Sequence, residues 1–267
     1  MEQKALGLLS NSHSMEAIAF CGSLPPGVTG SIYTMIAKHK PQGVIILLDA
    51  FQNAECLQTG NIDIVKINAE EARILAHSRY LIRKDSENED LKAVGIKIHG
   101  IFKISILAIT NGPLNAILLE RVGFELVVTY FAIPLLDSMN FVEPLSNASS
   151  LSHQSSLPEP TGEALSKSPL LNPLGAGDTC SAIFLLEYLD TRNAVQSFVH
   201  GLAAASASCL CVDSTSLFDL AIQRQIAELI KVDKNILLPN CLLSPFFMPF
   251  TFSRFFSTLS GIWRQNS

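Results

Sequence analysis

The run Asn172-Pro173-Leu174-Gly175-Ala176-Gly177-Asp178-Thr179-Cys180 ends a Ser/Pro-rich stretch and opens an apolar helix. A flexible glycine turn therefore delivers an acid, Asp178, to a helix N-terminus. The first turn of a helix has N–H groups without partners and carries roughly half a positive charge, so it attracts an anion. Gly175 and Gly177 lack a Cβ and let the backbone approach that anion closely. Asp178 can then accept a proton from an alcohol while the amides hold a transferring phosphoryl group.

The same run also has a purely structural interpretation, in which Asp178 is a simple N-terminal cap after a glycine turn. Short glycine motifs recur by chance, so the run alone leaves both interpretations open. It is not a Walker A loop, which needs a lysine and a Ser or Thr after the second glycine. It is an incomplete dinucleotide fingerprint, because Cys180 stands where the third glycine belongs.

Composition bounds the class of protein. A chain of 267 residues with 48% apolar and 16% charged residues can bury the core of one large domain. A net charge of −5 argues against a nucleic-acid surface, which normally has a basic face. The six cysteines are scattered without C-x-x-C pairs, which is typical of a reduced protein of the cytoplasm, and the six dispersed histidines argue against a zinc site.

The two ends differ from the middle of the chain. Residues 1–16 contain no apolar stretch long enough for a signal peptide, and we expect them to be disordered. Residues 236–267 form an apolar tail, dense in Phe, Leu and Met, that is close to the roughly 20 residues a membrane span needs. Pro245, Pro249 and Arg254 interrupt it, so a surface-docked tail or a terminus foreign to the fold is favoured over a membrane helix.

Between the ends, short apolar runs alternate with helical patterns, which predicts an α/β fold. Strands without polar alternation are buried on both faces, as in a parallel sheet covered by helices and joined by right-handed crossovers. Residues 116–133 read as an antiparallel hairpin at the edge of that sheet, and residues 177–230 as three successive helices. Residues 138–168 are rich in Ser, Pro, Asn and Glu, which predicts a disordered insertion. Strands are expected at 17–21, 44–49, 62–67 and 104–110, and helices at 31–39 and 70–77.

Ligands of open parallel sheets bind outside the carboxyl ends of the strands, so the loops that follow strands are the candidate site. Each loop also has a structural interpretation. Asn68 and Glu71 resemble a capping box, Lys66 a solvated strand end, Gly112 a positive-φ turn and Pro25-Pro26 a stiff turn. Four such loops at one edge of the sheet favour a site over four coincidences. They are Gly22–Val28, Lys66–Glu71, Thr110–Pro113 and the glycine turn before Asp178.

These residues carry a resemblance to a known family. The run 172–179 resembles the carboxyl-terminal signature of the PfkB, or ribokinase-like, carbohydrate kinases. Gly22–Val28 looks like the loop that these enzymes carry ahead of a helix, most of all in the phosphofructokinase and tagatose-phosphate kinase branch. Asn68–Glu71 fits the N-x-x-E element of the family, and Thr110–Gly112 its nucleotide-side turn. The resemblance extends over 17–230, which includes all the expected regular structure.

The resemblance implies a ribokinase-like three-layer sandwich, with a mainly parallel sheet and helices on both faces, in a domain at 17–235. It implies transfer of the γ-phosphoryl group of ATP to a hydroxyl of a sugar or sugar phosphate. Asp178 is then the base that deprotonates the acceptor alcohol, and the amides of Gly175, Ala176 and Gly177 form the anion hole. Phosphoryl transfer depends chiefly on positioning and charge stabilisation, which a metal ion and a helix N-terminus supply.

The resemblance also implies where ATP and Mg²⁺ bind. Glu71, with Asn68, organises Mg²⁺ and its waters near the phosphates, and Lys66 lies close to the phosphates. Implied contacts with the rest of the nucleotide come from Thr110, Gly112, His200 and Gly201, the last two on a helix that flanks the adenine.

One departure from the family keeps a second class of function open. Family members have a long amino-terminal portion, with the first strands, a lid and the residues that grip the sugar, whereas only about 20 residues precede the Gly22–Val28 loop here. We therefore expect the first strands and the lid to be missing. The alternative to an active kinase is an impaired or inactive remnant that binds nucleotide or a protein partner, and an oxidoreductase of the Rossmann type is a distant third. The identity of the sugar stays open, and so does the oligomeric state, for which a homodimer is one hypothesis.

Overall fold

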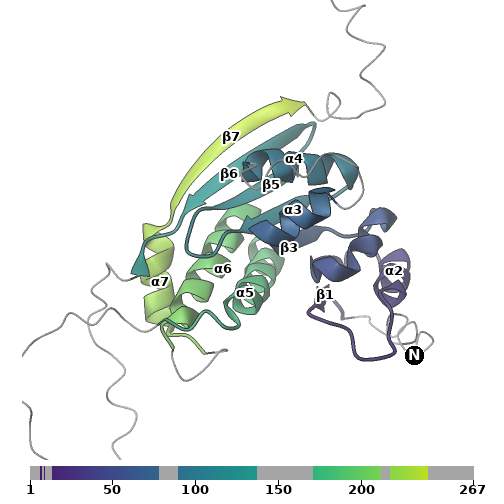
Figure 1. The fold of residues 1–267 in the computed structure, drawn as a ribbon, viewed down its shortest axis with the longest axis horizontal. Coiled ribbons are helices and arrows are strands. Elements are labelled where there is room, and N and C mark those ends of the chain that lie inside the picture. The colour runs from purple at the N-terminus through teal and green to yellow at the C-terminus, as the bar shows by residue number, and fades with distance from the viewer. Residues whose placement is uncertain are drawn as a thin grey trace, which may run out of the picture.

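The computed structural model describes residues 7, 9, 14–77, 90–136, 171–211 and 217–239. In this part of the chain seven strands form one sheet in the order β1-β2-β3-β4-β5-β6-β7 (Figure 1). The strands are β1 (Ala17–Cys21), β2 (Ile45–Asp49), β3 (Ile64–Asn68), β4 (Ile106–Thr110), β5 (Ala116–Val122), β6 (Glu125–Ala132) and β7 (Lys231–Pro239). The helices are α2 (Ser31–Lys38), the 3₁₀ helix η1 (Phe51–Thr59), α3 (Ala69–His77), α4 (Leu91–Ile101), α5 (Ala176–Thr191), α6 (Ala194–Cys209) and α7 (Leu220–Leu229).

The expected α/β class is confirmed, and the sheet is mixed. Strands β1 to β4 pair in parallel, as their largely apolar sequences predict. Strands β4 to β7 pair antiparallel. The expected hairpin is β5 and β6, whose pair Val122 and Glu125 encloses a two-residue turn. Gly123 has φ 60° at the first turn position, which is the conformation that a type II′ hairpin requires there.

Helices cover both faces of the sheet, so the molecule has three layers (Figure 1). Successive side chains of a strand point to opposite faces, and neighbours in β2 separate accordingly. Leu48 packs in the core beneath α2, η1, α3 and α4, whereas Leu47 packs in the core beneath α5, α6 and α7. In the second core Phe198 of α6 contacts Phe131 of β6 edge-on, with ring centroids 5.1 Å apart. Each face of the sheet thus has its own buried apolar layer.

Three described elements were absent from the expectations: η1, α4 and β7. The α4 sequence contains Gly95 and Gly100, which weaken a helical pattern. Gly95 packs closely against β5, because a Cβ there would lie 2.6 Å from Leu119 Cδ1 and would force that side chain to move. Strand β7 includes residues 236–239, the first four of the expected apolar tail. Residues 240–267, the insertion 138–168 and most of 1–16 lie outside the described residues.

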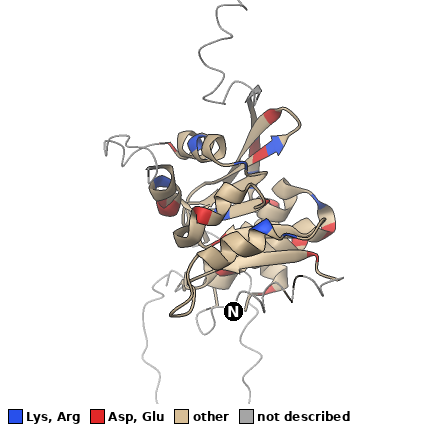
Figure 2. Ribbon diagram, turned by 90° about the vertical axis from the view of Figure 1, so that its right-hand side faces the viewer, with Lys and Arg blue, Asp and Glu red and all other residues tan. Residues whose placement is uncertain are grey.

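Charge is dispersed over the folded part of the chain. On the side that faces the viewer in Figure 2, basic and acidic residues are interspersed along the ribbon. Within the described ranges, no helix is both long and apolar enough to cross a bilayer.

Buried His99 predicts that the stability of the fold decreases at acid pH. It is 3% exposed on α4, and burial, followed by the Arg121 charge, lowers its pKa to about 4. Between the ordinary pKa of about 6.5 and this value, the unfolded chain binds a proton that the folded chain does not. We expect stability to fall by about 3 kcal/mol as pH drops through this window, at roughly 1.4 kcal/mol per pH unit.

The measurement is urea unfolding between pH 7 and pH 4. His99→Gln should flatten the acid loss, whereas His39→Gln, at an exposed position on the C-cap of α2, should leave it unchanged. An acid loss of equal size in all three proteins would contradict the assignment to His99.

Candidate functional site

The carboxyl ends of the parallel strands meet at one edge of the sheet, and the predicted loops leave from there. Cys21 at the end of β1 pairs with Asp49 at the end of β2, and Asn68 at the end of β3 pairs with Thr110 at the end of β4. Helix α5 begins at the same edge, because the carbonyl of Gly177 in its first turn contacts the Lys66 side chain of β3. Gly22, the first residue of the remaining loop, donates its amide to the Asp49 carbonyl at 3.3 Å, so all four predicted loops begin at this edge.

The first turn of α5 is open toward solvent. Gly175 has φ 78°, a left-handed conformation that reverses the chain into the helix. Its carbonyl accepts hydrogen bonds from the Thr179 amide at 2.9 Å and from Thr179 Oγ1 at 3.0 Å. The amides of Gly177 and Asp178 have no acceptor among the described residues, and the Asp178 side chain is exposed. Two free N–H groups and the helix dipole therefore favour an anion beside the Asp178 carboxylate.

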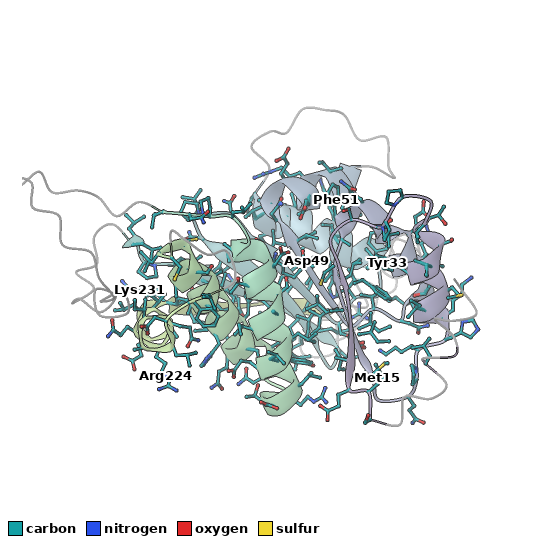
Figure 3. All side chains as sticks on the ribbon, turned by 90° about the horizontal axis from the view of Figure 1, so that it is seen from below. Met15, Tyr33, Asp49, Phe51, Arg224 and Lys231 are labelled. Carbon is teal, nitrogen blue, oxygen red and sulfur yellow. The ribbon has the colours of Figure 1, made fainter. Side chains whose placement is uncertain are left out.

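A buried polar network lies beneath this turn. Lys66 is 4% exposed, and its Nζ lies 3.4 Å from Asp49 Oδ2 and 3.1 Å from the carbonyl oxygen of Gly177. Ser181 Oγ donates to the same Asp49 oxygen at 2.5 Å and lies 3.2 Å from the Gly177 carbonyl. Asp49 is thus held between the sheet and α5, near the centre of the molecule in Figure 3. The interpretation of Lys66 as a solvated strand end is wrong, because the ammonium is buried and paired.

Asp178 and Asp49 act on a common neighbour, the Cys21 thiol. Desolvation raises the pKa of Cys21, and the negative charges of Asp49 and then Asp178 raise it further, while Lys66 opposes them. The Asp178 carboxylate therefore lies within electrostatic reach of the ends of β1 and β2. The thiol stays protonated near neutral pH, which argues against a nucleophilic role for Cys21.

Asn68 and Glu71 form a reciprocal capping box at the start of α3. The Glu71 amide donates to Asn68 Oδ1 at 2.9 Å, and the Asn68 amide donates to Glu71 Oε2 at 2.9 Å. The structural interpretation of this pair is therefore confirmed, and it does not exclude a metal. Mg²⁺ prefers carboxylate and carbonyl oxygens, keeps several waters, and commonly takes only one or two carboxylates from the protein. Each of these two oxygens keeps a lone pair beyond its capping bond, which fits a hydrated Mg²⁺, although the described residues contain no cluster of three or more ligating side chains.

The turn after β4 lies next to Asn68. Thr110 is half-buried and pairs with Asn68 in the parallel register. Gly112 has φ 58° in an exposed turn, so its structural role as a positive-φ residue is confirmed as well. This turn borders the space in front of Asn68 and Glu71.

His200 and Gly201 lie on α6, in surroundings different from those of the other candidates. His200 Nδ1 is 3.4 Å from Gln223 Nε2 of α7 and 3.8 Å from Glu187 Oε1 of α5. Gly201 is buried against α5, where a Cβ would lie 2.8 Å from the Cys180 carbonyl oxygen and 3.1 Å from Phe184 Cβ. Gly201 therefore has a packing role, and an adenine contact for either residue stays a prediction.

The packing role of Gly201 predicts a cost for a side chain there. Gly201→Ala should destabilise the chain by about 1–3 kcal/mol, because the new Cβ overlaps the backbone of α5. Chemical unfolding checks this value. Gly43→Ala is the comparison, because φ is positive at Gly43 but no atom lies within 4 Å of a Cβ built there. It adds backbone strain without a clash and should lower the free energy of unfolding by less than Gly201→Ala. An equal or larger cost at Gly43 would contradict the packing argument.

Two residues of the network were missed from the sequence, Asp49 and Ser181. Asp49 left a signal, since it is the one acid at the end of an apolar strand and thus at the ligand edge of the sheet. Ser181 left no signal in the sequence, because nothing about a serine in an apolar helix indicates a contact with Asp49, 132 residues away.

Comparisons with known proteins fit this geometry. No protein-family model matches the chain, and no curated protein matches it. Among solved structures, a putative phosphofructokinase from Staphylococcus aureus shares 15% identity at a TM-score of 0.56, over 90% of this chain and 64% of that chain. Phosphofructokinase-2 from Escherichia coli, in complex with substrates and products, shares 21% sequence identity at a TM-score of 0.56. The match covers 85% of this chain and 60% of that chain. A possible 1-phosphofructokinase from Thermotoga maritima shares 17% sequence identity at a TM-score of 0.57. The match covers 87% of this chain and 60% of that chain.

This chain has the ribokinase-like fold of the PfkB sugar kinases. The expectation drawn from the motif residues is confirmed at the level of the fold. The chain spans 60% to 64% of the length of these three structures. In this fold the α5 turn and the ends of β3 and β4 lie around one edge of the sheet. The likeness to these structures establishes the fold, and the activity is proposed below.

Proposed function

We propose that this chain belongs to an ATP-dependent carbohydrate kinase and carries its nucleotide side and catalytic base. The observation that carries the proposal is the open first turn of α5, with Asp178 beside two free amides, at the carboxyl edge of a sheet of the PfkB type. The carbohydrate kinase fold of the structural neighbours supports it. The alternative, a remnant that binds nucleotide without turnover, has no observation of its own in its favour.

In this proposal Asp178 takes the proton of the acceptor hydroxyl. The hydroxyl oxygen forms a bond to the γ-phosphorus of ATP, the bond from that phosphorus to the bridging oxygen breaks, and ADP leaves. The proton ends on the Asp178 carboxylate. The free amides of Gly177 and Asp178, with that of Gly175, face the negative charge of the γ-phosphoryl oxygens. The Ala176 amide, which was expected in the anion hole, instead donates to the Pro173 carbonyl at 3.2 Å.

The nucleotide is proposed to bind along the ends of β3 and β4. Asn68 and Glu71 would hold a hydrated Mg²⁺, which when bound neutralises phosphate charge. Thr110 and Gly112 would border the nucleotide, and His200 and Gly201 would lie on the adenine side. Lys66 adds positive potential beneath the phosphates, although its ammonium is already paired with Asp49.

The acceptor and the assembly are proposed by analogy with the structural neighbours. Escherichia coli phosphofructokinase-2 is described in complex with fructose-6-phosphate and in a tetrameric inhibited form. A sugar or sugar phosphate is accordingly the acceptor class that we propose, with a homo-oligomer, such as a homodimer, in the cytoplasm.

The test is ADP release from Mg·ATP with a panel of sugars and sugar phosphates. ADP formed in proportion to one acceptor supports the kinase, and a panel without ADP release contradicts it. Titration with a non-hydrolysable ATP analogue runs in parallel. Binding without turnover on the panel would favour the remnant, and absence of both would exclude the nucleotide role.

A further inference from the structure

We propose that Lys66 and Ser181 are positioning residues that hold the peptide joining Gly177 to Asp178, and with it the Asp178 amide, in the direction that the first turn of α5 gives it. The proposal rests on the proposed function and deepens it, because the Asp178 amide is one of the two free amides that are proposed to face the transferring phosphoryl group. It assigns Lys66 a role through the backbone, in place of direct contact with phosphate.

The held atom is the carbonyl oxygen of Gly177. Lys66 Nζ donates to it at 3.1 Å, and Ser181 Oγ lies 3.2 Å from it. Both side chains are buried, with Lys66 4% and Ser181 3% exposed, so water does not compete for the carbonyl from this side. A charged donor makes the stronger bond, and Lys66 is therefore the main partner.

Holding the carbonyl fixes the amide on the other side of the peptide. The peptide unit is planar and trans, so the N–H of Asp178 points opposite to the C=O of Gly177. With the carbonyl directed toward Lys66 beneath the turn, the N–H is directed outward, to the exposed side where the Asp178 carboxylate lies. Gly177 lies inside α5, so helical geometry already directs its carbonyl along the helix axis. A Cβ added at Gly177 would lie 3.2 Å from Lys66 Nζ, so the ammonium packs directly against this turn. Lys66 and Ser181 hold the peptide at the open end of the helix, where the amides of Gly177 and Asp178 have no acceptor among the described residues.

Asp49 connects the two positioning residues. Its Oδ2 accepts the Ser181 hydroxyl at 2.5 Å and lies 3.4 Å from Lys66 Nζ. The single Ser181 proton is shared between Asp49 and the Gly177 carbonyl, and the shorter contact, to the charged acceptor, dominates. Ser181 thus ties the first turns of α5 to β2, while Asp49 keeps Lys66 under the Gly177 carbonyl.

The first test needs no ligand and no turnover. The ¹⁵N relaxation order parameter of the Asp178 amide should be about 0.85 in the parent chain, as in rigid backbone, and should fall toward about 0.6 in Ser181→Ala. Asp49→Asn combined with Lys66→Met, which removes both charges together, should lower it as well. If that double variant does not fold, Ser181→Ala alone decides.

Ser208→Ala is the matched control. Ser208 is 1% exposed on α6, and among the described residues its hydroxyl bonds only within its own helix, to the Ala205 carbonyl at 2.8 Å. It should leave the order parameter of Asp178 unchanged. An Asp178 amide as rigid in Ser181→Ala as in the parent would overturn the proposal.

The second test uses turnover. Ser181→Ala should lower kcat about tenfold at an unchanged KM for ATP, less than the roughly 10²–10³-fold that deletion of an anion-hole donor costs. Ser208→Ala should change neither constant. An equal kcat for Ser181→Ala and the parent would overturn the positioning role. If the parent chain transfers no phosphoryl group, the proposed function falls, and the order parameter still decides whether these residues position the peptide.

Discussion

Asp178→Asn is expected to lose roughly 10²–10⁴-fold in kcat while it keeps its affinity for ATP, which is the usual contribution of a positioned general base. The amide of asparagine matches the carboxylate in size and cannot take the proton of the acceptor hydroxyl. Because Asp178 is exposed and its side chain forms no hydrogen bond or ion pair with the described residues, the fold should not depend on it. Steady-state kinetics gives kcat, and titration with an ATP analogue gives Kd.

Asp190→Asn is the control for this substitution, since it removes the same charge from an exposed position on the same helix. It should leave kcat and Kd as they are in the parent. Unchanged turnover in Asp178→Asn would remove the base from the mechanism, and a loss of ATP binding in step with turnover would assign Asp178 to binding instead.

Lys66→Met is expected to destabilise the chain by about 3–5 kcal/mol, because it leaves the Asp49 carboxylate without its cation. The two side chains are 5% and 12% exposed, so little solvent is available to replace the pair. Adding Asp49→Asn should recover most of the loss, since the uncompensated charge is then gone. The free energy of unfolding in urea measures both effects.

The Lys40–Asp63 pair serves as the comparison, because its side chains are 19% and 25% exposed. Lys40→Met should cost less than Lys66→Met, in the direction of the 1 kcal/mol or less that solvated pairs contribute. Equal costs at the two lysines, or no recovery on adding Asp49→Asn, would contradict the burial argument.

The regular elements were predictable where burial leaves a local pattern. Strands β1 to β4 are apolar on both faces, and that property alone identifies a covered parallel sheet. The hairpin at Gly123 was predictable because a two-residue turn with positive φ needs a glycine between two strand patterns. Helix α4 was not, since Gly95 serves a contact with Leu119 on another element, and no local rule reports such a contact.

The same division holds for the site. Asn68, Thr110 and the α5 turn were expected at one edge, because the carboxyl ends of parallel strands share an edge by construction. The network beneath them was not expected. Lys66 meets Gly177 across 111 residues and Asp49 meets Ser181 across 132, and such pairs form only when the helix packs on the sheet. The sequence therefore predicted where chemistry lies and not what holds its backbone in place.

An amide-resolved titration of the ¹⁵N-labelled chain with Mg·ATP tests the central claim most directly. The proposed site predicts that the largest shift changes fall at 175–178, 66–71 and 110–112. A cavity of about 510 Å³ at the opposite edge of the sheet, lined by 57–60 and 101–103, is the internal reference and should not respond. Changes confined to that cavity, or none at the α5 turn at saturating nucleotide, would contradict a phosphoryl-transfer site at the carboxyl edge.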